Sequence, residues 1–135
     1  MMALHIPKVT IGTPEVRLQT ALDDLARRLE GVGTLVVGDS NGLPVASITR
    51  GPKTLAATAS ATMVLSAAAS VASNMGLSGL EDVLLEGPDY KVLVQGLGHG
   101  FSIFAVLSSE ANLGIVRLVM NQKVAEIRTI LDDLR

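Results

Sequence analysis

The sequence predicts an α+β fold in which a five-stranded, mainly antiparallel sheet carries helices on both faces. Glycine-rich turn signals separate short runs of aliphatic residues, which is typical of hairpins. Two other segments repeat apolar residues every three or four positions, as amphipathic helices do. A third long segment, residues 54–80, is rich in Ala, Ser and Thr and holds no charged residue. The predicted order along the chain is α-β-β-α-β-β-β-α.

The first residues are predicted to form a flexible tail, because residues 1–13 are broken by Pro7 and Gly12 and show little periodicity. Residues 14–135 are predicted to form a single domain. A chain of 135 residues, of which 48% are hydrophobic, is long enough to bury one core.

A first helix is predicted to follow the tail. Thr13 offers a capping hydroxyl, and Pro14 suits the first turn of a helix. Gly31 and Gly33 are predicted to end this helix. Between these limits an apolar stripe runs at helical spacing: Leu18, Leu22, Leu25 and Leu29.

The next two strands form a predicted hairpin. Residues 34–38 and 43–48 are largely apolar, and the Asn41-Gly42 pair between them is a strong turn signal. Pro44 cannot donate a hydrogen bond to a neighbouring strand, so the second strand is predicted to lie at an edge of the sheet.

The second helix, predicted over residues 53–75 and closed by Gly76 and Gly79, is the most informative segment. No charged residue lies between Lys53 and Glu81, although a helix on the surface of a domain normally shows a charged face to water. Its eight alanines allow another backbone to come close. One interpretation is a helix packed tightly inside its own domain. We favour a helix that is also covered by a partner, most simply a second copy of the chain.

A membrane-spanning role for this helix is disfavoured, although its length would allow one. Seven of the residues at positions 54–73 are Ser or Thr, and neither aromatic anchors nor basic clusters flank the segment. The N-terminal residues also lack the features of a signal peptide. We therefore predict no membrane insertion and a cytoplasmic protein.

Three strands and a helix complete the predicted fold. The strands form an antiparallel meander with turns at residues 87–89 and 96–100: residues 81–85, 90–95 and 101–108. The last helix starts near Asn112 and repeats apolar residues at near-heptad spacing: Leu113, Val116, Met120, Val124, Ile127, Leu131 and Leu134.

Composition argues against several kinds of function. Only 2% of the residues are aromatic, the net charge is −2 and no block of basic residues occurs, so we expect no nucleic-acid binding. The chain has no cysteine, which excludes a thiol nucleophile and a cysteine-ligated zinc site. Neither His5 nor His99 has a second ligand at metal-binding spacing, so we expect no metal site.

The sequence does not indicate a catalytic centre either. The glycines of residues 96–100 precede a strand, whereas a phosphate-binding loop needs a helix after its glycines. Four carboxylates lie where edge and turn charges are expected: Glu81, Asp82, Glu86 and Asp89. We therefore expect a protein that is not an enzyme and that uses no cofactor. An enzyme would require His99 in a deep polar pocket or a buried carboxylate.

Two motifs resemble those of the Roadblock/dynein light-chain domain family, in its prokaryotic branch. Residues 35–47, LVVGDSNGLPVAS, resemble the first hairpin of the family, and residues 111–117, ANLGIVR, resemble its second signature. The element order also matches, and the resemblance covers about residues 14–134. It implies the roadblock/profilin-like fold.

The resemblance implies a homodimer or a heterodimer, in which the third strands pair into one ten-stranded sheet and the second helices pack together. It assigns ten positions of this chain to the dimer interface: Thr58, Thr62, Leu65, Ser66, Ala69, Ser73, Leu80, Glu81, Val83 and Leu85.

Members of this family bind and regulate small Ras-like GTPases, act as platforms in larger complexes or serve as dynein light chains. The resemblance therefore implies a homodimeric adaptor of a small Ras-like GTPase, without a catalytic arginine. Candidate GTPase contacts are Arg50, Lys53, Ala57 and Ala61, although the two charged residues also fit simple solubilising roles. The alternative is a structural subunit of a larger assembly, as a heterodimer with another Roadblock protein.

Overall fold

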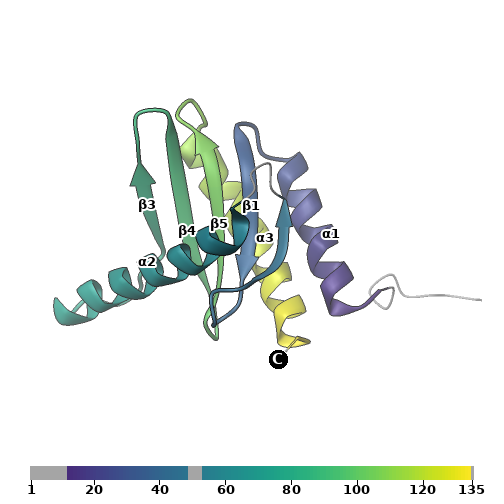
Figure 1. The fold of residues 1–135 in the computed structure, drawn as a ribbon, viewed down its shortest axis with the longest axis horizontal. Coiled ribbons are helices and arrows are strands. Elements are labelled where there is room, and N and C mark those ends of the chain that lie inside the picture. The colour runs from purple at the N-terminus through teal and green to yellow at the C-terminus, as the bar shows by residue number, and fades with distance from the viewer. Residues whose placement is uncertain (1–11, 49–52, 135) are drawn as a thin grey trace, which may run out of the picture.

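The computed structural model describes residues 12–48 and 53–134 and has the predicted order of elements (Figure 1). The elements are α1 Pro14–Arg27, β1 Val32–Gly38, β2 Pro44–Ile48, α2 Thr54–Asn74, β3 Asp82–Glu86, β4 Tyr90–Gly98, β5 Phe101–Ser108 and α3 Leu113–Asp132. The strands form one antiparallel sheet in the order β2-β1-β5-β4-β3. The predicted α+β class and the edge position of β2 are confirmed.

Helices lie on both faces of the sheet. α1 and α3 cover one face, and α2 crosses the other (Figure 1). Because side chains alternate along a strand, neighbouring residues of β1 enter different cores. Leu35 and Val37 belong to the larger core beneath α1 and α3, whereas Val36 belongs to the smaller core beneath α2.

The ends of the helices are set by local chemistry. The Thr13 hydroxyl accepts a hydrogen bond from the Val16 N–H at 3.2 Å, as predicted for the start of α1. α2 ends in a Schellman motif, in which Gly76 has a φ of 73° and the Leu77 N–H donates to the Ala72 carbonyl at 2.8 Å.

Two predictions about glycines are wrong. α1 ends at Arg27, and Gly33 lies inside β1, next to an irregularity in its pairing with β5. β4 continues to Gly98, so only His99 and Gly100 form the turn. Their φ values of 53° and 83° match the two left-handed positions that a type I′ hairpin requires. Of the predicted tail, all but the last two residues lie outside the described part of the chain.

An ion-pair cluster joins α1 to α3. The buried Lys123 ammonium lies 2.6 Å from Asp24 Oδ2 and 2.9 Å from Glu126 Oε1. The hydrogen bond from Lys123 is the main reason that the pKa of Asp24 lies below its usual value.

Asp24→Asn is therefore expected to reduce stability at neutral pH. A carboxyl with a lowered folded-state pKa stabilises the fold above its unfolded pKa of about 3.9, and this contribution disappears as the pH falls through the folded value. Urea unfolding of both proteins across this range measures the difference. Asp89→Asn, in the exposed β3–β4 turn, is the control. A stability difference that stayed constant down to the lowest pH would contradict a role for the Asp24 charge.

Candidate protein–protein interface

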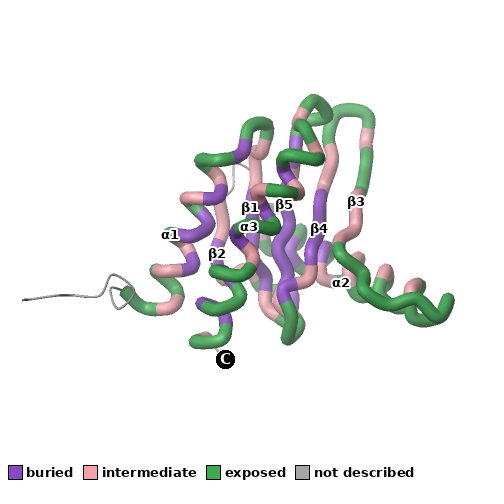
Figure 2. Tube along the Cα trace, turned by 180° about the vertical axis from the view of Figure 1, so that it is seen from behind, coloured by how far each residue is buried: buried purple, intermediate pink, exposed green. Residues whose placement is uncertain are grey.

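α2 is far more exposed than a core helix. Of its 21 residues only Thr58 and Ala61 are buried. The apolar side chains of Leu55, Met63 and Val71 are 61%, 71% and 64% exposed. The C-terminal half of the helix projects past the free edge of β3, and its trace is largely exposed (Figures 1 and 2). An uncharged helix with so little cover is a candidate contact surface.

One side of α2 packs closely on its own sheet. A Cβ atom at Gly38 would lie only 2.6 Å from Thr58 Cγ2, so the helix approaches β1 where the sheet has no side chain. Because their own sheet covers them, Thr58 cannot contact a second protomer and Ala61 cannot contact a GTPase. These two site predictions are wrong.

Other predicted interface residues of α2 differ in their exposure. Leu65 is half-buried against the smaller core, and the half-buried Thr62 hydroxyl donates to the Thr58 carbonyl at 3.0 Å. The remaining three are exposed on the helix: Ser66, Ala69 and Ser73. Their place in an interface stays a prediction.

The predicted interface residues around β3 lie at the edge of the sheet. Leu80, Glu81 and Leu85 are exposed, while Val83 packs partly on the smaller core. The edge strand β3 and the projecting half of α2 lie on the same side of the molecule (Figure 1).

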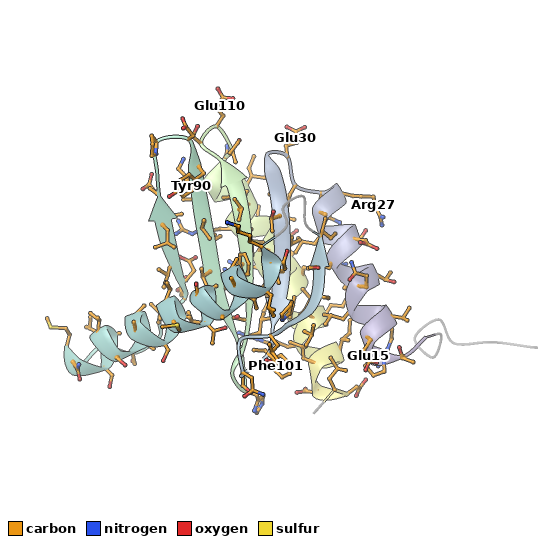
Figure 3. All side chains as sticks on the ribbon, viewed as in Figure 1. Glu15, Arg27, Glu30, Tyr90, Phe101 and Glu110 are labelled. Carbon is orange, nitrogen blue, oxygen red and sulfur yellow. The ribbon has the colours of Figure 1, made fainter. Side chains whose placement is uncertain are left out.

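α2 leaves part of its sheet face open. The helix passes over Gly38 and Gly96, near one end of the strands. Tyr90 lies toward the other end, away from the helix (Figure 3). Five partly or largely exposed side chains on this face form what we name the open sheet patch: Val83, Leu85, Tyr90, Val92 and Val106.

The side of α2 that faces the open sheet patch carries residues at heptad spacing. Gly42 of the β1–β2 loop lies close to Ala59 and Thr62. These two residues therefore mark the side of the helix that is turned away from the open sheet patch. Ala57 and four later residues, which we name the seam, therefore lie along the side of the helix that is turned toward the patch: Ala57, Val64, Ala68, Val71 and Met75.

The interface residues that were predicted on this helix begin at Thr58, one position after Ala57, the first residue of the seam. Both stripes have the required spacing and apolar or small residues, so periodicity alone does not separate them. The burial of Thr58 and Ala61 within the protomer decides which side of the helix remains for a partner.

The two edges of the sheet are protected differently. On β2 the Gln19 side chain of α1 pairs with the backbone of Ser47: its Nε2 donates to the Ser47 carbonyl at 3.1 Å, and its Oε1 accepts from the Ser47 N–H at 3.4 Å. Asp23 Oδ1, 3.2 Å from Gln19 Nε2, orients the amide. Gln19 thus takes the place of a neighbouring strand, and Pro44 removes another donor.

Gln19→Ala is expected to expose the β2 edge and to produce species larger than the wild-type assembly, because unpaired strand edges template further pairing. The loss of two hydrogen bonds should also lower stability by about 1–2 kcal/mol. Light scattering coupled to size exclusion measures the mass. Gln122→Ala, at an exposed position of α3, should change neither property. A Gln19→Ala protein of wild-type mass after prolonged concentration would contradict the protective role.

The candidate GTPase contacts lie around the start of α2. Lys53 and Ala57 are exposed, and Ala61 is excluded by its burial. Arg50 lies outside the described residues.

Three polar features bear on a hidden active site: possible metal ligands, His99 and the least exposed carboxylate of β3. No group of three or more potential metal ligands occurs among the described residues. His99 is exposed in its turn. Asp82, whose side chain is only 13% exposed, is held by the Arg117 guanidinium at 2.8 Å and 2.9 Å.

By length and composition α2 is long and apolar enough to cross a membrane, and it is the one such helix among the described residues. Such a match with one helix is weak evidence, since core helices of other proteins share it. Within this protomer only 11% of the residues in the 18-residue apolar window of α2 are buried, so the helix leaves much of its surface open to a partner.

Comparisons with known proteins agree with this fold. Residues 18–108 match the model of the Roadblock/LC7 domain. An uncharacterised protein of Methanocaldococcus jannaschii is 35% identical over 107 residues, which cover 76% of this chain and 87% of the relative. The gliding protein MglB of Thermus thermophilus superposes with a TM-score of 0.81 at 18% identity, covering 90% of this chain and 93% of MglB. An MglB with a tetrameric arrangement gives 0.82 at 18% identity and the same coverage. The chain therefore belongs to the Roadblock/LC7 domain family.

Proposed function

We propose that this chain is a non-catalytic, cytoplasmic homodimeric adaptor that binds a small Ras-like GTPase. The observation that carries the proposal is α2, an uncharged helix that its own domain covers along one side only. Such a surface in water favours association with another protein.

The arrangement of α2 and β3 supports a two-fold dimer. If two β3 strands pair in antiparallel fashion, the two sheets join into one of ten strands. α2 projects past β3 (Figure 1), so the same half-turn would carry the projecting half of each α2 over the open sheet patch of the other protomer. The two seams then pack against each other, and their alanines allow a close approach.

The outward side of α2 supports a further partner. It stays exposed when the seam is covered, and its residues are small or apolar: Ala56, Ala59, Ser60, Met63, Ala67 and Ser70. The Roadblock resemblance favours a Ras-like GTPase as the protein that covers it, and the fold likeness to the gliding protein MglB is compatible with that class. Lys53, at the start of α2, remains a proposed GTPase contact at the rim, and Arg50 remains a proposed contact from the sequence. Ala57 lies in the seam, where the proposed dimer would cover it.

Two measurements test the proposal. Light scattering should give a dimer at micromolar concentration, and a monomer would remove the foundation. Ras-like GTPases from the same genome, loaded with GDP or with a GTP analogue, should bind the immobilised dimer to different extents. Equal binding of both nucleotide forms would remove the regulatory part, whereas no binding would favour a different partner.

A structural subunit of a larger assembly is the second candidate. The same surfaces would serve a heterodimer with another Roadblock protein, and a heterodimer that displaces the homodimer on mixing would favour this function. Recovery of the protein with membranes rather than in the supernatant would instead favour lipid as the cover of α2.

A further inference from the structure

Asp82, the first residue of β3, is held by a residue of α3, the helix on the face of the sheet opposite to α2. Arg117 of α3 donates its Nε–H to Asp82 Oδ2 at 2.9 Å and a hydrogen on Nη2 to Asp82 Oδ1 at 2.8 Å. A bidentate pair of this kind sets both the position and the orientation of the carboxylate. The Asp82 side chain is 13% exposed and that of Arg117 is 39% exposed, so the pair is partly shielded from water.

The chain before β3 has little other support. Residues 75–81 are exposed, and apart from the adjoining residues no atom lies within 4 Å of a Cβ built at Gly76 or at Gly79. An open groove of about 560 Å³ separates this segment from α3, and its lining includes Leu80, Glu81, Asn121 and Arg128. β3 itself has only five residues and pairs with a single strand, β4. The salt bridge therefore restrains a short edge strand at its first residue.

We infer that Arg117 is a positioning residue for self-association, which holds β3 in the extended conformation that a second copy pairs with. This inference rests on the proposed dimer. The carboxylate of Asp82 connects α3 to the pairing edge, so Arg117 acts through the strand.

The geometry separates this role from general stability. Arg117 stands outside the larger core, which takes its neighbours Val116 and Met120 from α3. Loss of the salt bridge should leave that core intact while β3 opens from its first residue. Each monomer would then have to order β3 before the two strands could pair. Loss of the salt bridge should therefore weaken the dimer.

Arg117→Gln is expected to weaken the dimer about tenfold, the size of effect typical for a charge-assisted hydrogen-bonded pair after allowance for partial exposure. Sedimentation equilibrium measures the dissociation constant, and hydrogen exchange should show faster exchange in β3 than in α1 or β1. Arg117→Lys, which keeps the charge but not the bidentate geometry, should give an intermediate value. The exchange of charges in Asp82→Arg with Arg117→Asp should recover part of the loss.

Arg17→Gln is the matched control, because Arg17 forms a 2.6 Å ion pair with Asp133 away from β3. It should leave the dissociation constant unchanged. A wild-type dissociation constant in Arg117→Gln, with wild type itself a dimer, would overturn this inference and leave the proposed function intact. Uniformly faster exchange throughout the protein would also overturn it, since that outcome indicates a merely structural salt bridge. A monomeric wild type would instead refute the proposed function.

Discussion

Val71→Lys is expected to convert the dimer into monomers at micromolar concentration. Val71 is 64% exposed in the protomer, so a lysine there can be solvated and should barely change the stability of a monomer. In the proposed dimer the same residue lies in the seam between two α2 helices, and the two-fold axis brings in two charges at once. Burial of unpaired charges costs several kcal/mol, which corresponds to a dissociation constant raised by at least about 100-fold.

The control for this substitution is the neighbouring residue. Ser70→Lys adds the same charge in the same turn of α2 but on the outward side of the helix, so the protein should remain a dimer. Light scattering and sedimentation distinguish the two variants directly. Dimers of equal strength in both would place the contact on another surface, and dissociation of both would show that added charge on α2 is unfavourable at any position.

Local patterns predicted most of the fold because each element carries its own signal. The stripe from Leu18 to Leu29 gives α1, and Pro44 gives the edge position of β2. The errors concern glycine, which fits turns and strands alike: the sequence does not distinguish Gly33 within a strand from Gly31 in a loop with φ 79°.

The candidate interface could be predicted only in part. The absence of charge from α2 identifies the helix as a contact surface from sequence alone. Which side of it remains free depends on the sheet that it crosses, and the close approach of Thr58 to Gly38 is a tertiary contact without a local signal. The same holds for Gln19 on Ser47 and for Arg117 on Asp82, since residues 28 and 35 positions apart meet only in the folded chain.

Met63→Glu is expected to abolish GTPase binding while the dimer persists. Met63 is 71% exposed near the middle of α2 and points away from the sheet, opposite to the side that carries Thr58 and Ala61. An apolar side chain at the centre of a dry contact is the kind of residue that dominates binding energy, and its replacement by a charge should weaken binding by at least about 100-fold.

Leu118→Glu supplies the matched control for Met63→Glu. Leu118 is 58% exposed, but it lies on α3, on the opposite face of the sheet, so the same charge should leave both dimer and GTPase binding unchanged. Light scattering verifies the dimer of each variant, and binding of the GTPase with a GTP analogue is then titrated. Undiminished binding by a dimeric Met63→Glu protein would move the partner site off the outward side of α2. Loss of binding in Leu118→Glu alone would place that site on α3, because only a surface that the GTPase covers is sensitive to a charge added there.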